Sequence, residues 1–373
     1  MRSNLALPGI PLAIASAILF GASTPFAKLL LGAGASPWLL AGILYLGSGI
    51  GLGLVRLTRA LLGVRTAEAR LSRADLPWLA LVALSGGIVG PVLLMIGLST
   101  TPASAASLLL NLEGLATMAI AWIVFHENVD RRLLLGAVAI LLGGVLLSWT
   151  GGAGAVGLGA LAIAGACLAW GIDNNLTRRL SASDPVQIAM IKGLFAGLTN
   201  LVLALFAGAH LPALAVVAGG AVLGFFGYGL SLVLFVLGLR YLGAARTGAY
   251  FSLAPFIGAA LAIIVLGEAV TVRLLVAGVL MAFGLYLHLT ESHIHEHVHD
   301  EHDHEHRHVH DAHHQHAHDP DDPPGEPHTH RHHHAPLSHK HPHYPDIHHR
   351  HGHAQRPRST NKKNLPLPLL RGI

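Results

Sequence analysis

Charge is scarce over most of this 373-residue chain: Asp, Glu, Lys and Arg make up 12% of the residues, whereas 52% are hydrophobic. Of the 20 acidic residues, 12 fall after Thr290, so the long stretch before them is nearly free of negative charge. The alternation of polar and apolar faces that a water-soluble domain needs is largely missing there as well. These absences exclude an ordinary soluble core and predict a chain embedded in lipid.

Motifs of well-known enzymes are missing too. The single cysteine, Cys167, cannot form an intrachain disulfide. No phosphate-binding Walker loop, nucleophile elbow or spaced metal-hydrolase motif occurs. We therefore expect neither enzymatic catalysis nor ATP-driven pumping, no required cofactor and no nucleic-acid partner.

What the chain has instead is about ten apolar stretches of roughly 18 to 24 residues. At about 1.5 Å per residue, a helix of that length crosses a hydrocarbon layer about 30 Å thick and satisfies its own backbone groups in lipid. The first stretch is too long for the apolar core of a signal peptide, so we expect it to remain in the protein. The predicted spans are 9–29, 37–56, 77–97, 103–125, 132–149, 156–175, 186–207, 213–238, 245–266 and 271–289.

Basic residues fall mainly in alternate loops. The opposite set of loops carries little beyond Lys28 and Arg273. Because basic loops stay in the cytoplasm, we expect a multi-pass protein of the cell membrane with both termini cytoplasmic and an even number of spans. The residues of the basic side are Arg2, Arg56, Arg59, Arg65, Arg70, Arg73, Arg131, Arg132, Arg178, Arg179, Arg240 and Arg246.

The chain contains a repeat of itself. Leu112, Glu127 and Arg132 recur 141 positions later as Leu253, Glu268 and Arg273. A second match links 12–15 with 161–164, at an offset of 149. Five spans per copy is an odd number, so the second copy must be inverted relative to the first. We predict a first five-helix repeat at 1–150, a second at 151–290 and a separate tail at 291–373.

Several short motifs mark the two copies: Pro102–Ser107, His126-Glu127, Gly267-Glu268 and Leu253-Ala254-Pro255. With these motifs, residues 10–290 resemble the drug/metabolite transporter superfamily, in particular its EamA-like members. The resemblance implies a ten-helix carrier made of two inverted five-helix repeats, and it does not specify a substrate. The first half departs from the family pattern, because Glu113-Gly114 stands where the second half has Ala254-Pro255.

Three charged residues lie within or at the end of predicted spans. An unpaired carboxylate in the middle of a span costs several kcal/mol, so Glu113 must be protonated, paired or facing water. Our functional hypothesis is that Glu113 binds or exchanges a proton and that Lys192 holds an anionic substrate group or the counter-charge, with Asp173 nearby. The alternative is a fixed structural ion pair, or a lysine that reaches the interface while Asp173 meets the cytosol.

Other polar and aromatic residues are weaker candidates. Pro255 breaks the hydrogen-bond ladder of its span, as a hinge or as a static kink. Glu127 and Glu268 recur at a helix boundary of each copy, five residues before an arginine, and we interpret them as structural pairs and helix caps. Pairs of glycines such as Gly47 and Gly51 predict close helix packing. The residues expected to line a cavity, unless they only pack at the membrane interface, are Asn111, Asn174, Trp170, Tyr228, Tyr250 and Ser252.

After Thr290 the composition changes, and the tail holds 25 of the 28 histidines. With acidic residues and prolines interleaved, we expect this segment to be disordered without a ligand. Closely tethered imidazoles bind Zn, Ni or Co ions, here with loose and exchangeable coordination. The predicted metal ligands are His293, His295, His297, His299, His302, His304, His306, His308, His310, His313 and His314.

Three functions remain from the sequence. The first is a secondary carrier of a small metabolite or drug, acting outward and coupled to protons, as a monomer or homodimer. The second is a divalent-metal carrier fed or gated by the tail, although no span presents a His/Asp cluster at ligand spacing. The third is a membrane-anchored metal sensor or buffer without transport.

Overall fold

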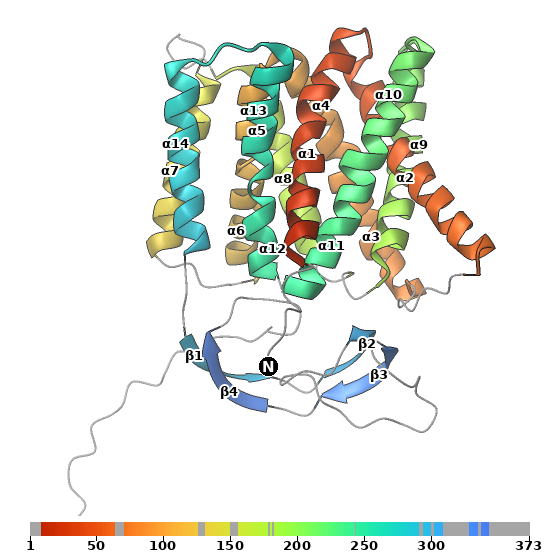
Figure 1. Cartoon of the computed structure of the whole chain (residues 1–373), viewed down its shortest axis with the longest axis vertical. Helices are drawn as coiled ribbons and strands as arrows, with labels where there is room; N and C mark the ends of the chain where they lie inside the picture. The colour runs from red at the N-terminus through yellow and green to blue at the C-terminus, as the bar shows by residue number, and fades with distance from the viewer. Residues whose placement is uncertain are drawn as a thin grey trace, which may run out of the picture.

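The computed structural model describes residues 9–63, 71–125, 131–149, 156–177, 180, 183–242 and 244–290, and the backbone of four strands further along the chain. The part before residue 291 is helical (Figure 1). Its α-helices are α1 (Gly9–Gly32), α2 (Pro37–Leu61), α3 (Leu76–Val82), α4 (Gly90–Thr100), α5 (Ala103–Leu109), α6 (Leu112–Phe125), α7 (Arg131–Ser148), α8 (Leu158–Thr177), α9 (Pro185–Phe206), α10 (Leu214–Gly224), α11 (Ser231–Leu242), α12 (Ala244–Phe251), α13 (Ala254–Leu266) and α14 (Val272–Leu289). A 3-10 helix, η1 (Arg73–Asp75), and two π-helices, η2 (Ala83–Val89) and η3 (Phe225–Leu230), complete it.

Nine helical segments of the described part are long and apolar enough to cross a membrane. A tenth helix, α8, has 20 residues, but Asp173, Asn174 and Asn175 lower the hydropathy of its last turns. It packs against both α4 and α6. The prediction of an all-helical membrane domain with ten spans is confirmed, and its polar sixth span is the one whose side chains matter most below.

The two halves repeat the same irregularities. The π-helix η2 in the first half has its counterpart η3 in the second, close to the 141-residue offset found in the sequence. The fourth span is broken between α5 and α6, and the ninth is broken between α12 and α13. α2 and α9 also begin alike, each with a proline in its first turn after a capping Ser36 or Asp184. These matches place five spans in each copy.

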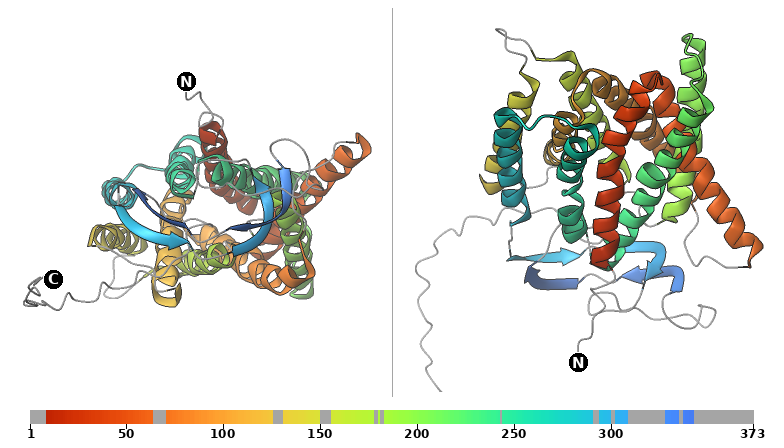
Figure 2. Two further views of the ribbon diagram at one scale, coloured as in Figure 1. Left: turned by 90° about the horizontal axis from the view of Figure 1, so that it is seen from below. Right: turned by 45° about the horizontal axis from the view of Figure 1, so that its top comes forward.

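Equivalent helices of the two halves pack antiparallel. Gly42 on α2 lies against Leu201 on α9, and Arg56 near the end of α2 reaches Asp184 at the start of α9. Similarly, α7 and α14 pack closely, and Arg273 at the start of α14 donates to the carbonyl of Trp149 after α7, at 2.6 Å. The second copy is therefore inverted, and α1 begins at the end of the bundle where α14 stops (Figures 1 and 2).

Glycines set how closely the central helices approach. A Cβ on Gly42 would lie 2.8 Å from the backbone nitrogen of Leu201. Gly47 and Gly51 of α2 contact Ala221 and Phe225, so the same helix packs on two neighbours. The predicted role of Gly47 and Gly51 in close packing agrees with these contacts.

Four strands lie beside the end of the bundle where α14 stops (Figure 2). They form two antiparallel pairs, β1 with β4 and β2 with β3, whereas the sequence predicts disorder without a ligand. The alternation of histidine with other residues has a period of two, which is the period of a strand, and this accounts for the difference. Their bounds are β1 (Ile294–His299), β2 (His302–His308), β3 (His328–His334) and β4 (Leu337–Pro342).

Candidate functional site

A buried ion pair joins α8 and α9 in the middle of the molecule. The Nζ atom of Lys192 lies 2.5 Å from Oδ2 of Asp173, and the two side chains are 10% and 8% exposed. Thr177, one turn further along α8, donates to the other carboxylate oxygen of Asp173 at 3.2 Å. Gly86 of η2 faces the same carboxylate, because a Cβ there would overlap it. The hypothesis that Lys192 meets a counter-charge therefore has a specific partner, Asp173.

Glu113 lies beside this pair but is held differently. Its Oε1 accepts a hydrogen bond of 2.9 Å from the amide of Asn174, the residue that follows Asp173 on α8. The same amide donates to Thr117 at 3.2 Å. Glu113 is half-buried, and among the described side chains no ion pair involves it. It is close enough to Asp173 and Lys192 to interact with both electrostatically.

A helix break positions Glu113. α5 ends at Leu109 and α6 begins at Leu112, so Glu113 stands in the first turn of α6, deep in the fourth span. The N-terminal end of a half-helix carries partial positive charge, which favours a negative group there. No proline causes this break, whereas Pro255 occupies the equivalent first turn of α13. Pro255 thus begins a new helix rather than kinking a continuous one.

Two residues predicted to line a cavity lie at the helix breaks. Asn111 is buried, donates to the carbonyl of Leu108 at 2.8 Å and contacts the sulfur of Met281 at 3.8 Å. Its counterpart Ser252 donates to the carbonyl of Gly248 at 2.7 Å. The same two carbonyls also accept the backbone N–H groups of Asn111 and Ser252, so each side chain adds a second hydrogen bond at its break.

Aromatic rings from both halves meet next to the charged residues. The indole of Trp170 and the hydroxyl of Tyr45 both donate to the carbonyl of Gly86, at 2.9 and 2.7 Å. The ring of Tyr45 lies 5.4 Å from that of Tyr228, which lies 6.0 Å from Phe20. The π-helix η2 exposes the Gly86 carbonyl to these donors, since a π-helix interrupts the regular ladder.

The sequence predictions found this cluster only in part. Trp170 and Tyr228 were among the candidates, whereas Tyr45 and Phe20 were not. A tyrosine such as Tyr45 in mid-span, far from either interface, was the available signal. Tyr250 is half-buried in α12, and its neighbour Phe251 is the residue that stacks on Phe20, with 5.4 Å between ring centroids.

Two hydroxyl groups near the rings have no hydrogen-bond partner among the described residues. They are Oγ of Ser107 on α5 and the hydroxyl of Tyr228 on η3, and both are buried. Gly258 leaves space for Ser107, because a Cβ there would lie 2.8 Å from its Oγ. Buried polar groups normally have partners, and the neighbour of the Tyr228 hydroxyl is Ser23, whose own hydroxyl donates to the carbonyl of Phe20.

The three charged residues of the site have uncharged counterparts at the equivalent positions of the other repeat. The counterpart of Asp173 is Thr24 at the offset of 149, and that of Glu113 is Ala254 at the offset of 141. When α2 and α9 are aligned on the prolines that begin them, at positions 37 and 185, Lys192 corresponds to Leu44. The site is therefore polar where α6, α8 and α9 meet and uncharged at the equivalent place in the other half.

Charged residues also close the two ends of the bundle. At the end where α2 stops, Arg56 lies 3.4 Å from Asp184, with 36% and 7% of the two side chains exposed. At the other end, Lys28 of α1 donates to the carbonyls of Leu98 and Thr101 at 2.6 and 3.0 Å. Each contact ties the terminus of one span to a neighbouring helix.

Glu268 caps the start of α5. Its two carboxylate oxygens accept from the backbone N–H groups of Ala103 and Ser104, at 2.6 and 2.8 Å. A helix begun by Pro102 leaves these N–H groups without partners, and a carboxylate satisfies them and complements the helix dipole. Glu127, the matching residue of the first copy, lies outside the described residues.

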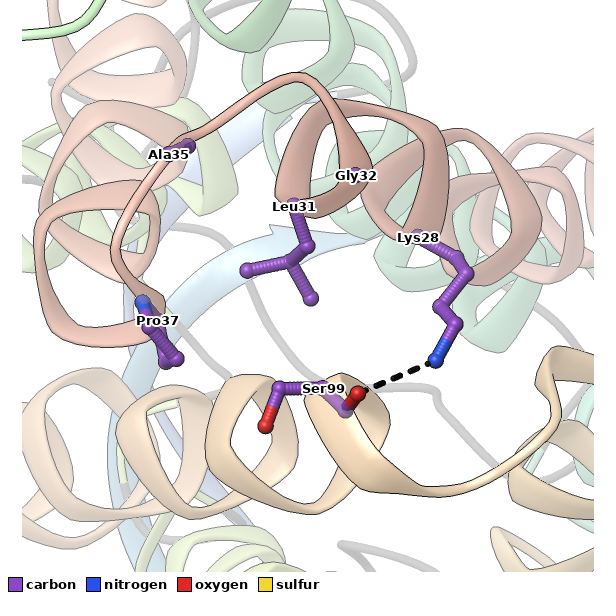
Figure 3. Close-up of a pocket in the computed structure, with 6 residues that line it drawn as sticks. All are labelled: Lys28, Leu31, Gly32, Ala35, Pro37 and Ser99. Carbon is purple, nitrogen blue, oxygen red and sulfur yellow. Dashed lines mark hydrogen bonds between the residues drawn. The ribbon is translucent and has the colours of Figure 1, made fainter.

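A pocket of about 380 Å³ lies at the same end (Figure 3). Lys28 reaches across it toward Ser99, while the rest of the lining is mainly apolar. It belongs to the end of the bundle rather than to the buried charges. The lining residues are Lys28, Leu31, Gly32, Ala35, Pro37 and Ser99.

The predicted metal ligands fall into two groups. His295, His297, His299, His302, His304, His306 and His308 lie on strands β1 and β2. His293, His310, His313 and His314 lie outside the described residues. Where the structure describes side chains, it contains no group of three or more metal-ligating residues.

Comparisons with known proteins agree with this architecture. A family model described as the EamA-like transporter family matches residues 7–149 and again 157–290. An uncharacterized transporter of Methanothermobacter thermautotrophicus is 30% identical over 292 residues, which cover 74% of this chain and 84% of the relative. A protein of known crystal structure shares the fold with a TM-score of 0.56 at 20% identity, covering 77% of this chain and 96% of the other.

Proposed function

This chain belongs to the EamA-like transporter family, and from that premise we propose that it is a secondary carrier exporting a small organic metabolite or drug in exchange for protons. The observation that carries the proposal is Glu113, a carboxyl group at a helix break in mid-span with an amide for its partner. Asp173 and Lys192 already neutralise each other beside it. Glu113 therefore holds the unbalanced charge of the site.

An unbalanced carboxylate supports coupling by competition. A charge at membrane depth costs several kcal/mol unless it is covered, so Glu113 is occupied in turn by a proton or by the solute. If one occupant must leave before the other binds, a proton gradient drives the solute in the opposite direction. The Asn174 amide serves both states, because it donates to the carboxylate and can remain in place when the acid is protonated.

The neighbouring groups fit a small organic solute. The rings of Tyr45, Tyr228 and Phe20 offer apolar and aromatic surface, and the hydroxyls of Ser107 and Tyr228 offer hydrogen bonds that the protein leaves free among its described residues. Pockets for small molecules combine apolar walls with a few placed polar groups. The uncharged counterparts Thr24, Leu44 and Ala254 would form the opposite wall.

The proposed setting is the cell membrane, with both termini in the cytoplasm. The even number of spans and the basic residues at the ends of α2 and α7, such as Arg56 and Arg132, support it. In that orientation the Arg56–Asp184 contact closes the cytoplasmic end, and the Lys28 contacts close the outer end. Export would then require these two closures to open alternately.

The test is transport by the full-length protein in proteoliposomes loaded with pooled metabolites. We expect an imposed pH gradient to drive loss of particular solutes, measured by mass spectrometry, together with proton uptake reported by an internal dye. Glu113→Gln should abolish gradient-driven flux, and Glu113→Asp should retain part of it. Equal flux in Glu113→Gln would overturn the coupling role of Glu113.

A parallel measurement decides between the solute classes. The same vesicles are offered Zn, Ni and Co ions, with the tail present and with the tail deleted. Movement of an organic solute that is unaffected by the deletion supports the proposal. Flux of metal alone, lost on deleting the tail, would replace it with the divalent-metal carrier.

A further inference from the structure

The strands of the histidine-rich tail pair in a register that sets histidine opposite histidine. In the antiparallel pair of β2 and β3, all four positions of even number on β2 are histidines, and each has a histidine as its partner. The pairs are His302 with His334, His304 with His332, His306 with His330, and His308 with His328.

Alternation along a strand then gathers these residues on one face. Positions two apart share a face, so the eight histidines of the β2–β3 ribbon occupy the same face. The opposite face takes the remaining positions. There Glu305 is paired with Arg331, and Asp303 is paired with His333. Opposite charges directly across an antiparallel pair stabilise it, and like charges destabilise it.

The second ribbon repeats the arrangement. In the pair of β1 and β4, His295 is opposite His341 and His297 is opposite His339, on one face. On the other face Glu296 is paired with Lys340. Both ribbons thus set histidine opposite histidine on one face and one acidic residue opposite a basic residue on the other, although His299 is opposite Leu337.

We propose that the histidine face of each ribbon is a binding site for divalent transition-metal ions such as Zn, Ni or Co, each ion held by imidazoles from both strands. Residues directly across an antiparallel pair have Cβ atoms about 4.5–5.5 Å apart, a separation that two imidazoles bound to one ion can span at metal–nitrogen distances of about 2.0–2.1 Å. Two adjacent cross-strand pairs supply the four ligands of a tetrahedral site.

This inference goes beyond the transport proposal and does not depend on it. It also differs from the loose coordination expected from the sequence, because ligands fixed by strand pairing make binding depend on register as well as on the number of histidines. Metal and strand pairing should then stabilise each other, since an ion that bridges two strands binds the paired state.

The experiment uses the full-length protein in detergent, with Co²⁺ as a spectroscopic probe and Zn²⁺ measured by calorimetry. Arg331→Glu keeps every histidine but puts like charges opposite each other, so we expect affinity to fall severalfold. The charge-swapped double variant, Glu305→Arg with Arg331→Glu, should restore it. A loss in the single variant that the swap does not repair would overturn the register.

A second comparison holds the number of histidines constant. Replacing His304 and His332, one cross-strand pair, with glutamine should lower affinity and the tetrahedral Co²⁺ absorption more than replacing His313 and His314, which lie outside the described residues. Equal losses from both double variants would mean that only histidine number matters, and the proposal would fail. Neither result depends on whether the protein transports a solute.

Discussion

The ammonium group of Lys192 and the carboxylate of Asp173 form a buried ion pair at 2.5 Å, within reach of a third charged residue that has no cation of its own among the described residues. That residue, Glu113, takes a single amide hydrogen bond instead. Two acids and one base at membrane depth therefore have different roles. The pair links α8 to α9 beside η2, which packs on both helices, and the remaining acid is held by the Asn174 amide.

Breaking the ion pair on one side should destabilise the protein. Lys192→Met or Asp173→Asn leaves a buried charge without compensation, at a cost of about 3–5 kcal/mol, whereas the double variant should lose less than the sum. Thermal unfolding in detergent measures this. Arg56→Met is the matched control, because its pair with Asp184 is more exposed and should cost about 1 kcal/mol or less.

Glu113→Gln should leave stability nearly unchanged, in contrast to the variants of the ion pair. The glutamine keeps an oxygen for the Asn174 amide and removes only the titratable group. Gradient-driven flux should fall by at least about tenfold in the same preparation, which corresponds to about 1.4 kcal/mol. An unfolding temperature several degrees below that of the parent protein would instead assign Glu113 a structural role.

Glu268→Gln tests the cap of α5. The variant weakens two charge-assisted hydrogen bonds, to the N–H groups of Ala103 and Ser104, and we expect a loss of about 0.5–2 kcal/mol in thermal unfolding. The repeat predicts that Glu127→Gln loses a similar amount, because it occupies the same position of the first copy. A stable Glu268→Gln variant would show that the backbone groups find other partners.

Gly42→Ala should be destabilising because α2 and α9 touch through it. The new Cβ would lie 2.8 Å from a backbone nitrogen, which cannot move aside as a flexible side chain could, so we expect a loss of about 1–3 kcal/mol. Gly32→Ala, near the end of α1, has nothing within 4 Å of the new Cβ and serves as the control. Equal unfolding temperatures for the two variants would contradict the tight packing.

Labelling of single cysteines can determine the orientation in the membrane. In a Cys167→Ser background, Ser72→Cys is exposed at the end of the bundle that we assign to the cytoplasm, and Ala33→Cys is exposed at the opposite end. An impermeant thiol reagent added to intact cells should label only the cysteine at residue 33. Labelling of residue 72 alone would reverse the orientation.

Much of the fold could be predicted because lipid imposes it. The helices were predicted from the length of the apolar stretches, because a chain in hydrocarbon must satisfy its own backbone groups. The inversion was predicted from the odd number of spans, five, in each repeat. The π-helices could not be found in this way. η3 has no sequence signal apart from clustered glycines, η2 has only these and Pro91, which follows it, and the break before Glu113 occurs without a proline.

The site was predicted as a set of residues but not as a set of contacts. Glu113, Asp173 and Lys192 were identified because charge is expensive in lipid. Asn111 and Ser252 were predicted to line a cavity, and the structure adds that each side chain bonds a backbone carbonyl beside a helix break. Tyr45 was missed because its partner, the Gly86 carbonyl, becomes available only in a π-helix.

The sequence by itself determined that this protein is a bundle of membrane helices in two inverted copies. Hydropathy and the repeat depend only on the order of residues along the chain, and no knowledge of tertiary contacts is needed to find them. The tertiary structure alone decided that Lys192 pairs with Asp173 and leaves Glu113 to Asn174. These residues come from α6 and from the consecutive helices α8 and α9, and no fixed spacing along the chain predicts which of the two acids the lysine contacts.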